Sequence, residues 1–199
     1  MKKILSIVRI MRMPNLLIVV LTMFILRYGL IRPFLFSGQT GMMSGWLDFS
    51  LLVLSTVLIT VAGYIINDSF DAGIDAINKP GKNRVGPDFS ERSALYMYQI
   101  LNGVALIVAV YLAFRLQSLT LGLLFPFIIY LVWLYSSKYK KSLIMGNLIV
   151  AFLSAMVIFM VWYFEFLHLR MSPEVFATVL PDMKNLNLFF IIYGLFAFL

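Results

Sequence analysis

The chain has 199 residues, of which 62% are hydrophobic and 13% are charged, and it carries a net charge of +7. A soluble domain carries about 25% charged residues, so this composition excludes a soluble fold and indicates a membrane protein whose excess Lys and Arg residues contact anionic lipid rather than nucleic acid. The absence of cysteine and the presence of a single histidine exclude disulfide bonds and metal sites built from thiolates or several imidazoles.

Five stretches of the chain are apolar and long enough to cross a membrane as helices, which takes about 20 residues each. The first is interpreted as a membrane helix rather than a signal peptide, because no small-residue cleavage site follows it. A sixth stretch begins near Leu186 and is interpreted as a truncated helix. We predict an all-α, polytopic transmembrane bundle, a single domain over residues 1–199 with five full spans plus the start of a sixth. The five spans are predicted at 14–31, 47–66, 94–114, 119–135 and 143–167.

Lys and Arg residues are unevenly distributed between the two sides of this predicted bundle. Eleven of the 16 lie in the N-terminal segment and in the loops 68–93 and 137–142, and the other five lie on the opposite side. Because basic residues concentrate on the cytoplasmic side of membrane proteins, we expect a cytoplasmic N-terminus. We predict a multi-pass protein of the cell (inner) membrane.

Three polar residues lie toward the outer ends of their spans. Arg27 is expected to snorkel outward from the first span to the membrane surface. Glu165 and His168 lie one helical turn apart in the fifth span, and we expect them to form a pair at the membrane interface.

The loop after the second span is the sharpest feature, because it holds five of the nine acidic residues. On a helix, Asp68, Asp71 and Asp75 fall within about 60° of one another, and Asn67 widens the arc to about 100°. Three carboxylates on one face repel one another and require a positive partner. Oxygen ligands without Cys or His favour Mg²⁺ or Ca²⁺, and the spacing does not fit an EF-hand. These four residues form the predicted metal site.

Basic residues follow the acidic cluster at Lys79, Lys82 and Arg84. Carboxylates that hold a divalent cation, together with Lys or Arg side chains that neutralise phosphate oxygens, make a metal–phosphate site. Charges at the end of a membrane helix are costly and tend to be functional. By residue type alone, the alternative is a solvated cytoplasmic loop whose charges only anchor the topology.

The segment from Asn67 to Asp75 resembles NDxxDxxxD, the first aspartate-rich motif of the UbiA superfamily of intramembrane prenyltransferases. As in the family's KPxRP-like stretch, Lys79-Pro80 follows, although Lys82 and Asn83 replace the family's Arg and second Pro. Other segments are similar to the start of the family's first helix and to the connection between its fourth and fifth helices. They are Arg12-Met13-Pro14-Asn15, Tyr135-Ser136, Lys140 and Gly146-Asn147.

The resemblance implies a fold of nine transmembrane helices, of which this chain supplies the N-terminal two-thirds, and a second aspartate-rich motif that the sequence does not contain. It implies Mg²⁺ as the cofactor, with the metal bound by Asn67, Asp68, Asp71 and Asp75 and catalysis carried by Asn67, Asp71 and Asp75. The residues implied to bind the diphosphate of a prenyl donor are Arg12, Lys79, Lys82, Arg84 and Lys140. The residues implied to contact the acceptor or to line the cavity are Asn15, Tyr135, Ser136 and Asn147.

The predicted function is transfer of an isoprenoid chain from a prenyl diphosphate to a hydrophobic acceptor, on the cytoplasmic side of the bilayer. The acceptor is expected to be either an aromatic quinone precursor or a glycerol-phosphate lipid. An alternative is a membrane transport or cation-binding protein without catalysis, which should place polar groups at mid-membrane depth. A third possibility is an inactive fragment of the enzyme, because the second motif is missing.

Overall fold

The computed structural model describes residues 11–36, 45–78 and 90–198, without the side chains of residues 73–78, and every regular element in these ranges is a helix. The first membrane-spanning helix, Met13–Leu35, consists of three consecutive segments, the second of which is a π-helix. A second π-helix joins the fourth and fifth long helices. The elements are α2 (Met13–Phe24), η1 (Ile25–Ile31), α3 (Arg32–Leu35), α4 (Trp46–Asn78), α5 (Glu91–Arg115), α6 (Leu119–Leu134), η2 (Tyr135–Tyr139), α7 (Leu143–Arg170) and α8 (Pro173–Phe198).

Six helical segments in the described ranges are long and apolar enough to cross a membrane, and the first five confirm the predicted spans. The sixth prediction was wrong in extent, because α8 begins at Pro173 rather than near Leu186. Its first residue is a proline, whose fixed φ suits the start of a helix. Polar residues interrupt the apolar run before Leu186, but they lie on the exposed face. Its buried face is formed by Val179, Met183, Leu186 and Phe190, at the spacing of an amphipathic helix.

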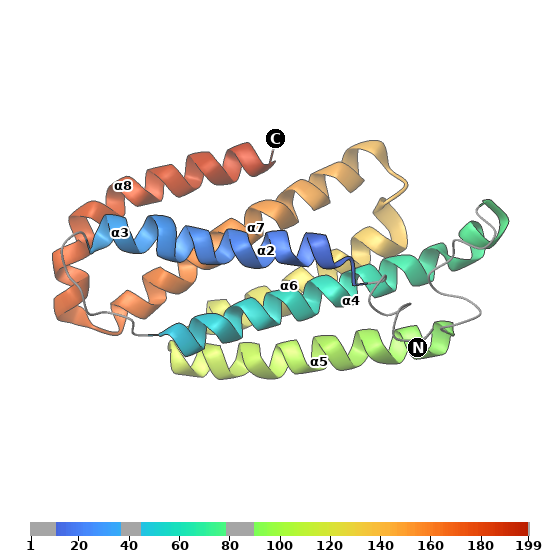
Figure 1. Ribbon diagram of the computed structural model, residues 1–199, viewed down its shortest axis with the longest axis horizontal. Coiled ribbons are helices and arrows are strands. Elements are labelled where there is room, and N and C mark those ends of the chain that lie inside the picture. Colours follow the sequence, from blue (N-terminus) through green and yellow to red (C-terminus); the bar gives the residue numbers. More distant parts are fainter. Residues whose placement is uncertain (1–10, 37–44, 79–89, 199) are drawn as a thin grey trace.

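The helices run along the long axis of an elongated bundle (Figure 1). α4 packs along α5, α7 packs along α8, and α2 contacts both α4 and α7. One end of the bundle gathers the C-terminal end of α4, the start of α5 and the connection from η2 to α7. The opposite end holds the start of α4 and the turn between α7 and α8 (Figure 1).

Serine side chains cap the N-termini of three of the long helices. The hydroxyl of Ser90 accepts a hydrogen bond from the backbone N–H of Ser93 (3.2 Å) at the start of α5. Ser118 does the same for α6, and Ser142 for α7. Such caps satisfy backbone donors that a helix leaves free at its first turn, so the polar loops define where each span starts.

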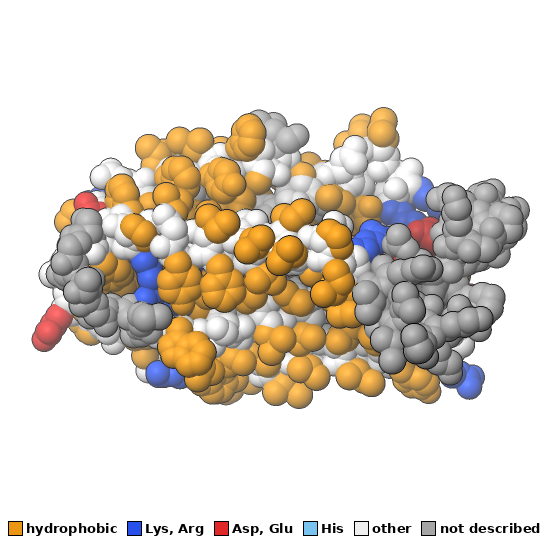
Figure 2. All heavy atoms as spheres, viewed as in Figure 1, with side chains coloured by type: hydrophobic (Ala, Val, Ile, Leu, Met, Phe, Trp, Pro, Cys, Tyr) orange, Lys and Arg blue, Asp and Glu red, His pale blue; other side chains and the backbone are white. Residues whose placement is uncertain are grey.

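The sides of the bundle are covered by hydrophobic side chains, and the charged side chains visible on this face gather toward the two ends (Figure 2). Large apolar residues such as Leu17, Ile107, Phe114 and Leu143 are more than half exposed. A soluble protein does not expose an apolar surface of this extent, so the surface fits a lipid environment.

At the end opposite the acidic motif, the prediction for Arg27 was wrong. Arg27 does not snorkel, because its side chain is 0% exposed and its Nε donates to Glu165 Oε2 at 2.7 Å. Glu165 is equally buried, and Arg32 Nε lies 3.5 Å from its other oxygen. The Arg27 guanidinium also donates to the hydroxyl of Tyr28 (3.2 Å) and to the carbonyl of Gly45 (3.1 Å). This buried pair joins η1 to α7.

Aromatic rings and one glycine complete the surroundings of the buried pair. The Arg27 guanidinium carbon lies 4.5 Å from the ring centre of Phe49 and 5.2 Å from that of Phe164, distances at which a cation is attracted to a ring. Gly45 has φ +73°, and a Cβ there would lie 2.6 Å from Cε1 of His168. Glycine is therefore required at the point where the chain enters α4 beside this cluster.

Candidate active site

The acidic motif lies on the last turns of α4, which continues as a helix from Trp46 through all four predicted metal ligands to Asn78. The helical extension that the spacing required is therefore present. The side chains of Asn67, Asp68 and Asp71 are part of the described structure, whereas that of Asp75 is not. Lys79, Lys82 and Arg84 lie outside the described residues, so their assignment to the diphosphate stays a prediction.

Arg12 meets the acidic motif from the start of α2. Its Nη2 lies 2.9 Å from Oδ1 of Asp68, and its guanidinium carbon lies 4.7 Å from the ring centre of Tyr64, one turn earlier on α4. Arg12 has φ +49°, a left-handed conformation that costs a non-glycine residue free energy and is common at functional sites. Its Nε is buried and has no hydrogen-bond partner among the described residues.

Lys140 meets the same motif from the other side. Its ammonium group forms an ion pair with Asp71 and lies 3.5 Å from the backbone carbonyl oxygen of Asn67. Lys140 follows directly after η2, and its backbone N–H donates to the carbonyl of Tyr135 (2.9 Å) in the π-helical pattern. The wider turn of a π-helix, a feature frequent at functional sites, thus positions this lysine.

Gly146 lets α7 begin close to that turn. A Cβ at Gly146 would lie 2.7 Å from the backbone carbonyl oxygen of Tyr139, too close for any larger residue. The predicted connection between the fourth and fifth spans is therefore compact, and it holds Lys140 beside the end of α4.

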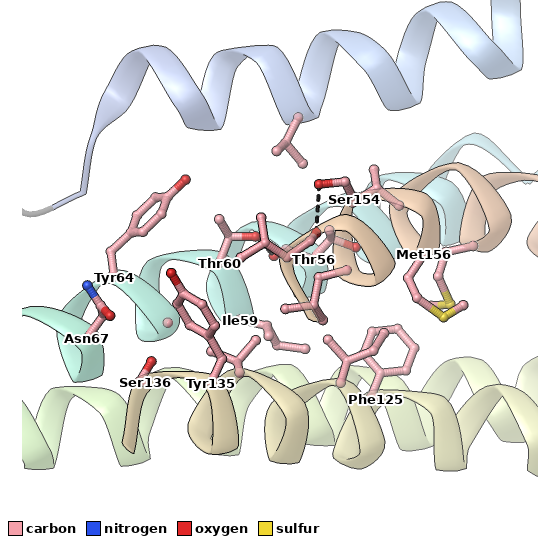
Figure 3. Close-up of a pocket in the computed structure, with 18 of the residues that line it drawn as sticks. Thr56, Ile59, Thr60, Tyr64, Asn67, Phe125, Tyr135, Ser136, Ser154 and Met156 are labelled. Carbon is pink, nitrogen blue, oxygen red and sulfur yellow. Dashed lines mark hydrogen bonds between the residues drawn. The ribbon is translucent and has the colours of Figure 1, made fainter. Parts of the chain in front are cut away.

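An apolar cavity of about 380 Å³ opens next to these charges, between α2, α4, α6 and α7. Asn67, Tyr64, Tyr135 and Ser136 lie toward one end of it, and Phe125 lies toward the other (Figure 3). The lining residues of α4 share one helical face at spacings of three and four. They are Thr56, Ile59, Thr60, Gly63, Tyr64 and Asn67.

Three hydroxyl groups deeper in the cavity donate to their own helices. Thr56 donates to the carbonyl of Leu52 (2.9 Å), and Thr60 donates to that of Thr56 (2.7 Å). Ser154 on α7 donates to the carbonyl of Val150 (3.0 Å), a bond drawn in Figure 3. The inner wall therefore presents methyl groups and aromatic rings rather than free donors.

Besides Nε of Arg12, Oδ1 of Asn67 and Oγ of Ser136 are buried at the charged end without hydrogen-bond partners among the described residues. Buried polar atoms are rarely left unsatisfied without a functional reason. The amide oxygen of Asn67 lies on the same face as the carboxylates of Asp68 and Asp71, so the donor set is all oxygen and fits Mg²⁺. Within the described ranges no three carboxylate, histidine or cysteine side chains group closely enough to hold a metal, and Asp75 is the candidate for a third carboxylate.

The structure thus brings seven of the predicted site residues to the mouth or wall of the cavity. Asn15 and Asn147 are exposed and do not line it. The lining residues among the seven are Arg12, Asn67, Tyr135 and Ser136, and the ion-paired residues beside the mouth are Asp68, Asp71 and Lys140.

Sequence reasoning missed the cavity wall next to the motif. Tyr64 and Thr60 lie three and seven residues before Asn67, so helical spacing alone places them on its face. Gly63 approaches α6 closely, because a Cβ there would lie 2.8 Å from Cγ1 of Val132. The α7 residues of the wall carry no comparable sequence signal, because apolar side chains cover all sides of that helix.

Fold and site together define a polytopic membrane protein with a charged site at the mouth of an apolar intramembrane cavity. Such a site suits a ligand with an anionic head and an apolar tail. The chain belongs to the UbiA prenyltransferase family, which it matches over residues 33–199. The resemblance seen in the motif from Asn67 to Asp75 is thereby confirmed.

Several curated relatives carry the name digeranylgeranylglyceryl phosphate synthase. That of Methanoregula boonei is 36% identical over 116 residues, 57% of this chain and 40% of the relative. Those of Methanospirillum hungatei and Thermococcus sibiricus are 30% and 36% identical over 55% and 53% of this chain, and 38% and 36% of their own lengths. The chain therefore matches about two-fifths of each relative. No solved structure matches it significantly.

Proposed function

We propose that the protein is a membrane prenyltransferase that transfers an isoprenoid chain from a prenyl diphosphate to a lipid acceptor. The observation that carries the proposal is the meeting of Asp71 and Lys140, and of Asp68 and Arg12, at the mouth of the apolar cavity. A prenyl diphosphate has the matching shape, with a polyanionic head and an apolar tail. Family membership supports the same activity.

Each group of residues has a distinct part in the proposed reaction. Asn67, Asp68, Asp71 and Asp75 would hold Mg²⁺, which neutralises charge on the leaving diphosphate when it is bound. Arg12 and Lys140 bind the diphosphate oxygens that the metal leaves free and stabilise the charge that develops as the allylic C–O bond breaks. The apolar wall of the cavity keeps water away from the allylic cation.

The acceptor then completes the transfer. Its hydroxyl oxygen forms a new C–O bond to the allylic carbon, the hydroxyl proton is released, and diphosphate leaves. The names of the relatives favour a glycerol-phosphate lipid over an aromatic quinone precursor as acceptor. We therefore propose geranylgeranylglyceryl phosphate as the first acceptor to test, with an aromatic acceptor as the second.

The proposal is tested by Mg²⁺-dependent transfer from geranylgeranyl diphosphate in membranes that contain the protein. Asp71→Ala and Asp75→Ala are each expected to lower the rate by about 100-fold or more, since each removes a carboxylate that would hold the Mg²⁺ needed to neutralise the departing diphosphate. Asp182→Ala is the matched control, because Asp182 is an exposed acid on α8 away from the site. It should transfer at the wild-type rate.

Undiminished transfer in both Asp71→Ala and Asp75→Ala would contradict the assignment of the site. Mg²⁺ binding that depends on Asp71, without transfer to either acceptor, would favour the rival class of a cation-binding membrane protein. Transfer only to an aromatic acceptor would retain the enzyme class and change the proposed substrate.

A further inference from the structure

The cavity has one closed end, which lies away from the charged site. Phe125 on α6 and Met160 on α7 line that part of the wall, and their side chains are only 1% and 2% exposed. Phe125 and Met156 lie together there, far from Asn67 (Figure 3). A ligand tail that enters beside Asn67 therefore runs toward an aromatic ring and thioether groups.

The distance between the two ends is set by α6 and the π-helix η2 that continues it. Phe125 and Ser136 line the cavity at its opposite ends (Figure 3) and lie eleven residues apart, which corresponds to about 16 Å along a helix. The closed end is thus a finite distance from the site of ionisation, short enough for the length of a prenyl chain to matter.

Packed core lies behind the closed end. Phe125 and Met160 belong to the main hydrophobic cluster, together with Leu121 of α6 and Phe164 of α7, which lie farther from the charged site along their helices. Protein interiors are packed too densely to admit extra atoms. A longer tail can therefore pass Phe125 only if its ring moves. Removal of the ring would leave an apolar cavity, and such cavities bind apolar groups.

We propose that Phe125, assisted by Met160, sets the longest prenyl chain that the cavity holds and so determines donor specificity. The inference rests on the proposed function, since it takes a prenyl diphosphate as the ligand. Tails that end before Phe125 gain affinity with each added isoprene unit through apolar burial. A tail that would extend past Phe125 gains nothing from its last unit.

The test is competition binding of farnesyl, geranylgeranyl and geranylfarnesyl thiodiphosphates to the protein in detergent with Mg²⁺. In Phe125→Ala we expect the affinity for the longest ligand, relative to that for the shortest, to rise by at least about tenfold, since one more isoprene unit becomes buried. Phe127→Ala is the matched control. Phe127 lies on the same helix, is 45% exposed, and packs edge-on against Phe152, so this ratio should not change.

Equal affinity ratios in Phe125→Ala, Phe127→Ala and the wild type would overturn the inference, because the tail would then leave the cavity before it reaches Phe125. Phe125→Leu and Met160→Ala enlarge the same end more mildly and give the same test if Phe125→Ala does not fold. A wild-type protein that binds none of the three ligands would refute the proposed function itself, and this inference with it.

Discussion

Lys140 and its neighbour Lys141 have the same chemistry and different surroundings. Lys140 is ion-paired with Asp71 at the mouth of the cavity, whereas Lys141 is exposed on the adjacent turn. Arg12 is held in the same way by Asp68. These carboxylates are also the proposed metal ligands, so the basic side chains and a divalent cation would compete for the same oxygens. A bound diphosphate would end this competition, because its oxygens would accept hydrogen bonds from Arg12 and Lys140 and leave the carboxylates to the metal.

This difference predicts that the same substitution has different effects on ligand binding at the two lysines. Lys140→Met is expected to weaken binding of a prenyl diphosphate by about tenfold or more, because a charge-assisted contact to phosphate is lost. Lys141→Met should bind like the wild type. The measurement is the Kd of geranylgeranyl thiodiphosphate in the presence of Mg²⁺. Equal weakening by both substitutions would mean that only net positive charge matters at this surface.

Among the helices, the first five membrane spans were predictable, because the length of an apolar stretch alone indicates whether it can cross a membrane. The start of α8 was not, because Pro181 and Asp182 interrupt the apolar run and only the buried side of the helix reveals its continuation. The position of Arg27 was also not predictable, since its partner Glu165 lies 138 residues away. For the site, spacing on one helix identified the acidic face, whereas the cavity required the packing of four helices.

The pair of Arg27 and Glu165 predicts how η1 and α7 are held together. Arg27→Met removes the closest cation from the buried Glu165 carboxylate, whose other oxygen lies 3.5 Å from Arg32 Nε, so we expect a loss of about 3–5 kcal/mol in the free energy of unfolding. The double variant Arg27→Met/Glu165→Leu removes both charges and should recover most of that loss. Chemical unfolding in detergent measures both values. A double variant as unstable as the single one would show that the charges themselves are not the cause.

For the whole molecule, the predicted orientation can be tested directly because the chain contains no cysteine. Ser137 and Ser172 are both exposed and lie at opposite ends of the bundle, the first in η2 and the second in the turn before α8. With a cytoplasmic N-terminus, Ser137→Cys should react with a membrane-impermeant maleimide only after the cells are opened. Ser172→Cys should react in intact cells or spheroplasts. The reversed labelling pattern would invert the proposed topology and place the site on the outer side.

The first membrane-spanning helix, Met13–Leu35, is joined to its neighbours by two ion pairs that differ in exposure. The pair of Arg12 and Asp68 has side-chain exposures of 33% and 10%, whereas the pair of Arg27 and Glu165 is completely enclosed. Dissolved salt screens charges that solvent reaches and leaves enclosed charges almost untouched. Rising ionic strength therefore loosens this first helical segment beside the acidic motif before it loosens the end at Arg27, and the mouth of the cavity responds to the ions around it.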